Sequence, residues 1–457
     1  MRHTGEAKIV SGAVLALLVA IATSFLSGCA MYNSPQPTVE DSDGPFDFHV
    51  IQADDQGSLW STPQAQRVLD RVQTLSQQQN TLVVVFIHGW HHNAASDDPN
   101  LVDFRQALVA LDGELSTPRR QDLRSRATGS PGSRLVGIYV GWRGRSLPGP
   151  LDYLTFWGRK PAAERVGEGD VGEFIERLQR IYLRANAAAM DAPGRPNVGL
   201  VTIGHSFGAQ VLWKSLGRQL EMPLAERAPC MSNSLVPQPA VQDDVRVPID
   251  SLGDLNILLN PALEAYQFAR VDALYRQLRY PSSQTPQIVV FSADNDSARS
   301  FWFPAARGVS WFVRPTFRKD NDGYQGQLYG QALGDLQRQL THELVRSPDD
   351  ADSLSQASYA GDQALLDYDF TGTTSFGGIR LSPRPSTDPQ AAGRIAYSPV
   401  LVVESKDKII DGHNGIFQDG LREFLTKYVS FIEAKRLLLR ARREIQVHNG
   451  SAPPACH

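Results

Sequence analysis

Six short and largely apolar runs recur along the 457-residue chain, at residues 82–87, 135–140, 198–203, 255–259, 288–291 and 400–403. Runs of this length are typical of strands that are buried on both faces of a parallel sheet. A further short candidate strand precedes them at residues 46–51, and apolar residues at helical spacing lie between most of the runs. This alternation predicts an α/β fold, in which helices flank a mostly parallel central sheet.

Three stretches interrupt the alternation and are predicted to be insertions, at about residues 144–167, 221–253 and 304–394. The third is too long for a structureless loop in a compact domain. We therefore expect a helix over residues 330–346 and irregular chain over residues 347–394. A last helical pattern, which includes Leu421 and Phe424, is expected to pack on the sheet, and residues 448–457 form a loose tail.

The beginning of the chain has the layout of an export signal. Arg2 and Lys8 precede an apolar run at residues 9–25, which is followed by a Leu-Ser-Gly-Cys tetrapeptide ending at Cys29. This tetrapeptide resembles the bacterial lipobox. The resemblance implies a signal peptide over residues 1–28, cleavage before Cys29 and lipidation of that cysteine. The alternative is a single membrane-spanning anchor, since about 20 apolar residues can cross a bilayer.

The residues after Cys29 indicate which membrane the protein is attached to and how the folded domain is joined to it. Ala30 follows Cys29, and by resemblance to Gram-negative sorting signals this implies the outer membrane, with the protein facing the periplasm. Residues 29–45 contain prolines and aspartates, which predict a tether between the membrane and the folded domain. We expect the fold to start near Phe46.

Charge and cysteine content exclude some partners. The formal charge is −4, and it becomes −5 on cleavage because residues 1–28 carry two basic and one acidic side chain. No dense basic run favours nucleic acid as a partner. The nearest candidate, residues 440–443, is expected to be solvated and to complement the dipole of the last helix. Cys230 and Cys456 remain besides Cys29, which allows one disulfide. The oligomeric state is not predicted.

The pattern Gly204-x-Ser206-x-Gly208 follows the third apolar run and precedes a helical pattern. In this position it is typical of a nucleophile elbow, a sharp strand-to-helix turn that exposes a serine hydroxyl. Ser206 is therefore the candidate nucleophile, while the alternative is an ordinary glycine-flanked turn. His205 adjoins the serine and is expected to point away from it.

A serine nucleophile requires a base and an acid that orients the base. His413 is the candidate base, because it follows the last predicted strand and lies on a loop that can reach Ser206; otherwise it is an exposed turn residue. Asp296 is the favoured acid after the run at residues 288–291, and Asp294 is the alternative, although its earlier position suits turn formation. Both carboxylates could instead cap the turn.

Backbone donors for an oxyanion are expected beside the serine. A His-Gly-Trp sequence ending at Trp90 follows the first buried run, and Gly89 would let the N–H of Trp90 point into the site beside that of Phe207. The alternative is a tight turn that places the Trp90 ring in the core.

These motifs together resemble the α/β-hydrolase superfamily, with its chain order of serine, acid and histidine. The resemblance covers residues 46–447 as one domain with insertions. It implies Ser206 as nucleophile, Asp296 as acid, His413 as base, and the N–H groups of Trp90 and Phe207 as oxyanion donors. The long separation between Asp296 and His413 departs from the usual pattern.

Other kinds of site have weaker support. His88, His91 and His92 do not have the spacing of a helical zinc motif, and no cofactor, metal or nucleotide site is predicted. Aromatic residues at 153–157, 301–303 and 311–312 suit an acyl pocket, a lid or ordinary core packing.

The sequence therefore predicts a membrane-anchored serine hydrolase that cleaves a small-molecule or lipid ester. Acyl transfer, thioester cleavage and peptide cleavage are alternatives that would use the same residues. A second alternative is a non-catalytic envelope protein that keeps the hydrolase fold as a binding platform.

Overall fold

A mostly parallel ten-stranded sheet forms the centre of the molecule, with the strand order β1-β3-β2-β4-β5-β6-β10-β7-β9-β8. In the computed structural model, the described residues are 34–38, 40–41, 44–146, 155–191, 194–227, 249, 252–296, 324–353, 356, 361–384 and 395–448. The strands are β1 (Asp47–Gln52), β2 (Asn80–Ile87), β3 (Ser133–Gly141), β4 (Val198–His205), β5 (Leu255–Leu259), β6 (Ile288–Ala293), β7 (His342–Arg346), β8 (Thr374–Phe376), β9 (Ile379–Pro383) and β10 (Val400–Ser405). All the pairings between these strands are parallel except those of β9 with β7 and β8.

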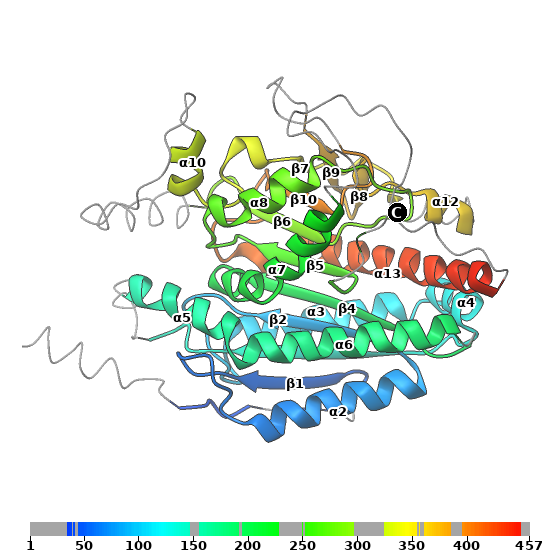
Figure 1. Cartoon of the computed structure of the whole chain (residues 1–457), viewed down its shortest axis with the longest axis horizontal. Helices are drawn as coiled ribbons and strands as arrows, with labels where there is room; N and C mark the ends of the chain where they lie inside the picture. Colours follow the sequence, from blue (N-terminus) through cyan, green and yellow to red (C-terminus); the bar gives the residue numbers. More distant parts are fainter. Residues whose placement is uncertain are drawn as a thin grey trace, which may run out of the picture.

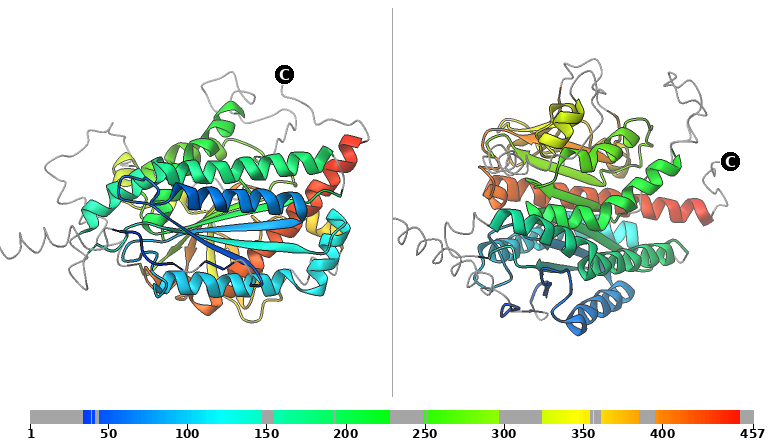
Figure 2. Two further views of the ribbon diagram at one scale, coloured as in Figure 1. Left: turned by 90° about the horizontal axis from the view of Figure 1, so that it is seen from below. Right: turned by 60° about the vertical axis from the view of Figure 1, so that its left-hand side comes forward.

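Helices cover both faces of this sheet, as the left view of Figure 2 shows for α2 and α6 on one face and α3 on the other. The helices of the first face are α2 (Thr62–Gln78), α5 (Phe156–Glu168), α6 (Asp170–Asp191), α7 (Phe207–Arg227) and α8 (Ala265–Tyr275). The second face carries α3 (Pro99–Leu115), α4 (Pro118–Thr128), α12 (Asp362–Asp367) and α13 (Asp419–His448). Each face buries its own apolar core, so the central strands are covered on both sides.

Local sequence explains where several helices begin. The first turns of α2, α3 and α4 each contain a proline, which has the backbone angle of a helix and lacks an N–H that would need a partner. Ser61 caps α2 by accepting a hydrogen bond from the N–H of Gln64, and Asp98 caps α3 through the N–H of Asn100.

The predicted α/β class and the mostly parallel sheet are confirmed, and the architecture is compatible with an α/β-hydrolase-like fold with insertions. All seven predicted strands are present, as β1 to β6 and β10. Their residues are almost all buried, which is why continuous apolar runs predicted them.

The prediction for residues 330–346 is wrong. This stretch contains the end of α10 (Tyr324–Gly330), the 3₁₀ turn η5 (Gln337–Gln339) and strand β7 instead of one helix. His342, which the sequence places in a helix, begins β7 and pairs with Val403 of β10. The free edge of β10 supplies backbone partners that a helix-like pattern of apolar residues does not reveal.

Residues 347–394 are also more regular than expected, because α12, β8 and β9 lie within them. Arg440, which the sequence predicts to be solvated, is instead 9% exposed and bonded to the buried Asp254. Among the described residues, no helix has the length and apolar character needed to cross a bilayer.

The parallel strands direct their carboxyl ends to one edge of the sheet, which we call the carboxyl edge. In Figure 1 the arrowhead of β1 points to this edge, at the left of the view. The loops after β2, β4, β6 and β10 leave the sheet there, and they carry the residues for which the sequence predicts a site.

Candidate active site

Ser206 occupies a one-residue turn between β4 and α7, and its φ of 54° lies in the left-handed region. Three backbone hydrogen bonds hold this turn. The N–H of Ser206 donates to the carbonyl of Leu259 (3.0 Å), while its own carbonyl accepts from the N–H groups of Ala209 and Ala262 (both 3.1 Å). A non-glycine residue in this conformation costs roughly 1–3 kcal/mol, so the surrounding bonds must enforce it. The turn has the geometry expected of a nucleophile elbow.

The glycines around Ser206 allow close backbone approach. A Cβ on Gly204 of β4 would lie 2.7 Å from the Cα of Ala209 in α7, because the helix turns back against the strand that it follows. A Cβ on Gly208 would clash with the carbonyl of Ile87 at the end of β2. Any side chain at these two positions would push α7 away from the sheet and displace the serine.

His413 lies between Ser206 and Asp296. Its Nε2 is 2.6 Å from the Oγ of Ser206, and its Nδ1 is 2.7 Å from Oδ2 of Asp296. An ionised carboxylate only accepts hydrogen bonds, so Nδ1 carries the proton and Nε2 is free to accept the proton of the serine hydroxyl. Ser206 and Asp296 are 2% and 3% exposed, so water competes little for these bonds. The structure thus brings together the three residues selected from the sequence.

Asp294, the alternative acid, has a different environment. Its Oδ2 lies 3.7 Å from Nζ of Lys406, and Lys406 also contacts Glu404 at 2.9 Å. The backbone N–H of Asp294 donates to the carbonyl of Ser405, which ties the end of β6 to the end of β10. Asp294 therefore belongs to a partly exposed charge cluster, and Asp296 is the acid that contacts His413.

Asn260 fixes the loop that carries His413, and the sequence did not single it out. Its Nδ2 donates to the carbonyls of Gly412 (3.0 Å) and His413 (2.9 Å), and its Oδ1 accepts from the N–H of Ala293 (2.8 Å). The residue is fully buried at the end of β5 with a φ of 42°. Asparagine tolerates this conformation better than most residues, and here its amide joins the ends of β5 and β6 to the histidine loop.

A second asparagine joins the loop after β6, which carries Asp296, to the loop after β10, which carries His413. The Oδ1 of Asn295 accepts from the N–H of Gly412 (2.9 Å), and its Nδ2 donates to Asp411 (2.8 Å). The two loops are far apart in sequence, so these hydrogen bonds hold Asp296 and His413 close together in place of a direct chain connection.

His205, which adjoins Ser206 in sequence, bonds to the loop that carries His413. Its Nε2 donates to the carbonyl of His413 (3.0 Å), and the ring is fully buried. Burial, together with the neighbouring His413, holds the pKa of His205 well below its usual value, so the ring is neutral. The carbonyl of His413 thus accepts from two buried side chains, His205 and Asn260.

The loop after β2 lies directly against the elbow. A Cβ on Gly89 would lie 2.8 Å from the Cβ of Ser206, so only glycine lets this loop approach the serine. Trp90 is 4% exposed, its ring centroid lies 6.4 Å from that of Phe207, and its Nε1 donates to Thr155 (3.2 Å). Phe207 is the first residue of α7, where backbone N–H groups point out of the helix end. Both residues therefore flank Ser206, and the Trp90 ring also packs in the core, as the alternative reading predicted.

A buried histidine sets the shape of this loop. Nε2 of His88 accepts from the N–H of Trp142 (3.0 Å), so Nδ1 carries the proton and donates to the carbonyl of Gly89 (2.8 Å). The indole of Trp142 stacks on the His88 ring and donates to its carbonyl (2.9 Å). Burial lowers the pKa of His88 to about 4, which keeps the ring neutral and this bonding pattern intact at neutral pH.

The other histidines of the loop bond elsewhere. His92 pairs with Asp98 at 3.0 Å, and His91 stacks on Trp90 with the ring centroids 3.8 Å apart. In the described part of the chain, no group of three or more side chains suited to a metal is present. Cys29, residues 301–303 and 311–312, and the side chains of residues 153, 156 and 157 lie outside what the structure describes.

Comparison of the chain with models of known protein families, with curated proteins and with solved structures finds no match.

Proposed function

We propose that the protein is a serine hydrolase that cleaves a carboxylic ester through an acyl-enzyme at Ser206, and that it is anchored in the bacterial envelope by lipid on Cys29. The observation that carries the proposal is the unbroken series of hydrogen bonds from Asp296 through His413 to Ser206. The strained elbow, the glycine-dependent approach of the Trp90 loop and the fixed tautomer of His413 support the same assignment.

The proposed reaction has two steps. Oγ of Ser206 attacks the ester carbonyl carbon while its proton moves to Nε2 of His413, and the N–H groups of Trp90 and Phe207 stabilise the oxyanion. The intermediate then expels the alcohol, which takes the proton from His413, and leaves an acyl group on the serine. Water next attacks this acyl group, gives a proton to His413 and releases the acid, after which the proton returns to Oγ.

Asp296 acts through His413 in both steps. Its carboxylate keeps the Nδ1 proton in place and stabilises the imidazolium that forms in each transition state. Because Asp296 is buried and 2.7 Å from Nδ1, this stabilisation acts with little competition from solvent.

Active-site labelling tests the chemistry. A fluorophosphonate should modify the folded protein on Ser206, as located by mass spectrometry, and Ser206→Ala should not be labelled. Absence of labelling in folded wild-type protein, or equal labelling of the variant, contradicts the hydrolase proposal and favours a non-catalytic platform. Product analysis with competing alcohols and with thioester and amide substrates separates ester hydrolysis from the alternative reactions.

Lipidation is tested separately. Cells that express the protein should incorporate labelled palmitate into it, and Cys29→Ala should abolish both this labelling and partition into the membrane fraction. Retention of the variant in membranes without labelling supports a spanning anchor instead.

A further inference from the structure

The segment after the proposed anchor is docked on the sheet. Residues 41 and 48 form an antiparallel bridge, with the N–H of Asp41 donating to the carbonyl of Phe48 (3.1 Å). Farther toward the N-terminus, the N–H of Gln36 donates to Oε1 of Gln52 (2.8 Å), and Nε2 of Gln52 donates back to the carbonyl of Gln36 (2.9 Å). The part of the predicted tether that the structure describes therefore bonds along β1 rather than standing clear of the domain.

The direction of this docking places the start of the described chain at the carboxyl edge. Because the segment runs antiparallel to β1, Gln36 meets the last residue of that strand, Gln52. Figure 1 shows the dark-blue beginning of the described residues on the side to which the β1 arrow points. Ser206 lies at the same edge, three strand positions away in the order β1-β3-β2-β4, which is about 14 Å.

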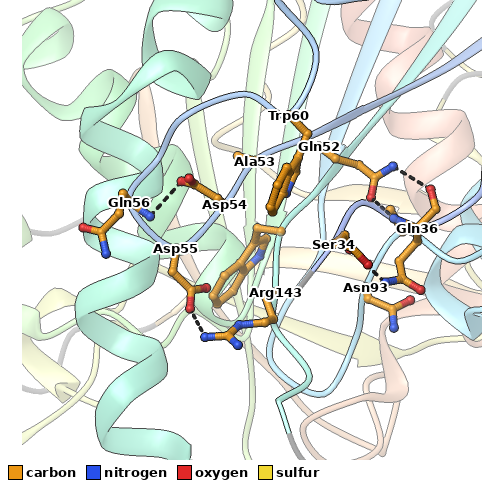
Figure 3. Close-up of a pocket in the computed structure, with 12 residues that line it drawn as sticks. Ser34, Gln36, Gln52, Ala53, Asp54, Asp55, Gln56, Trp60, Asn93 and Arg143 are labelled. Atoms are coloured by element: carbon orange, nitrogen blue, oxygen red, sulfur yellow. Dashed lines mark hydrogen bonds and ion pairs between the residues drawn. The ribbon is translucent and has the colours of Figure 1, made fainter. Parts of the chain in front are cut away.

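A cavity of about 250 Å³ is lined both by the segment and by residues that follow β2 and β3. Ser34, Gln36, Gln52, Asn93 and Trp142 are among the residues that line it, and Figure 3 shows Asn93 beside Ser34 and Gln36. Asn93 is three residues beyond Trp90, and Trp142 stacks on His88. The docked segment and the loop that approaches the serine thus line the same cavity.

Trp60 gives this region an exposed aromatic surface. Its backbone N–H donates to the carbonyl of Gln52 (2.9 Å), its side chain lines the same cavity, and the residue is 44% exposed. Tryptophan is enriched where protein meets the membrane–water interface, since its ring is largely apolar and its N–H is polar.

We propose that docking of residues 34–38 along β1 holds the carboxyl edge, with Ser206 and Trp60, against the membrane that carries Cys29, and that the substrate is an ester lipid of that same membrane. The inference rests on the proposed hydrolase activity and lipidation. Only five residue steps separate Cys29 from Ser34, so covalent geometry limits their span to about 17 Å. A domain of this size is about 50 Å across, so an anchor at the opposite end would keep the serine far from the lipid.

The test uses the full-length acylated protein in phospholipid vesicles that contain a fluorescent ester lipid, and compares its rate with that on a short, water-soluble ester. A Gly/Ser insertion of about 20 residues after position 33 adds a flexible span of roughly 25 Å. It should lower the rate on vesicle lipid by about tenfold or more, because the serine is no longer held at the surface. The rate on the soluble ester should stay unchanged.

Point variants separate docking from tether length. Gln52→Ala removes both docking bonds, because they join the Gln52 side chain to the backbone of Gln36. It should also lower the ratio of the two rates, whereas Gln56→Ala, at the same cavity but without a bond to the segment, should not. A brominated phospholipid should quench fluorescence in wild-type protein, and Trp60→Phe should remove most of that quenching. An unchanged rate ratio in both the insertion variant and Gln52→Ala, or quenching that Trp60→Phe leaves intact, overturns the proposal.

The controls distinguish this proposal from those on which it rests. If wild-type protein cleaves neither ester, the proposed hydrolase function fails. If it cleaves the soluble ester but does not remain on the vesicles, lipidation fails. Retention on the vesicles with cleavage of only the soluble ester contradicts the assignment of a membrane lipid as substrate.

Discussion

Two carboxylates only two positions apart, Asp294 and Asp296, have opposite surroundings. Asp296 is 3% exposed and contacts the histidine ring, whereas Asp294 faces Lys406 at the protein surface. Burial and a direct hydrogen bond to the base are what an orienting acid requires, and a surface ion pair contributes little. The chemistry of the site therefore depends on which of these two side chains turns inward after β6.

This difference predicts distinct kinetic effects for two matched substitutions. Asp296→Asn should lower kcat by about 10⁴-fold with little change in the fold, because the amide favours the wrong tautomer of His413. Asp294→Asn should leave kcat within about twofold, because that carboxylate makes only a partly exposed ion pair. Steady-state kinetics on a soluble ester compares the two, and an equal loss in both variants would contradict the assignment.

Asn260 bonds to the backbone of the loop that carries His413, so in the proposed reaction it would position the base rather than touch the substrate. Asn260→Gly keeps the left-handed backbone conformation accessible but removes the bonds to Gly412, His413 and Ala293. We expect kcat to fall by about 10–100-fold through misplacement of His413, with KM nearly unchanged. Asn260→Asp keeps the acceptor for Ala293 and loses the two donors.

These two variants distinguish positioning from general stability. If the donors to the histidine loop matter most, Asn260→Asp should lose as much kcat as Asn260→Gly. Thermal unfolding of both proteins checks the alternative, because a purely structural role predicts a lower Tm with normal kcat in the protein that remains folded.

At the scale of elements, the loop after β2 owes its shape to a neutral histidine. The pKa of His88 is lowered to about 4 from its ordinary value near 6.5, so the unfolded chain binds a proton at pH values where the native protein does not. The neutral His88 ring therefore imposes no cost on folding above pH 6.5, and the free energy of unfolding falls as the pH is lowered from 6.5 toward 4. The loss amounts to about 3 kcal/mol, since each unit of pKa difference corresponds to 1.36 kcal/mol.

Replacing His88 should therefore change how steeply the stability of the protein depends on pH. Between pH 6.5 and 4, His88→Gln should show a shallower fall in the free energy of unfolding than the wild type, measured by urea denaturation at each pH. Part of the fall in the free energy of unfolding should remain in the variant, because the pKa of the buried His205 is also lowered. A wild-type slope in the variant would show that His88 is protonated in the native protein.

The strands differ in whether the sequence alone could predict them. The buried strands were recognisable because most of their residues face apolar surroundings on both sides, and Ser206, His413 and Asp296 were recognisable because they follow such strands. Strand β7 was missed, since its pairing with β10 depends on a free edge rather than on its own residues. Asn260 and His205 were not assigned their roles because they act on a backbone loop more than 150 positions away in sequence.

At the scale of the whole molecule, a buried charge cluster ties the last helix to the sheet. Asp254 is 1% exposed and accepts from Arg436 (3.0 Å) and Arg440 (2.5 Å) of α13, from Tyr182 of α6 (3.0 Å) and from the N–H of Leu200 in β4 (3.1 Å). The cluster lies at the amino end of β5, whereas Ser206 bonds to Leu259 at the carboxyl end, about 13–17 Å away along the strand.

This separation predicts that stability and activity can be changed independently. Asp254→Ala leaves two arginines buried without their carboxylate and should lower the free energy of unfolding by about 3–5 kcal/mol in urea titrations. The matched variant Asp419→Ala, which removes a 91% exposed carboxylate from the start of the same helix, should cost less than about 1 kcal/mol. At temperatures where Asp254→Ala remains folded, its kcat should equal that of the wild type. A lower kcat in the folded variant would mean that α13 transmits strain along the sheet to the histidine loop.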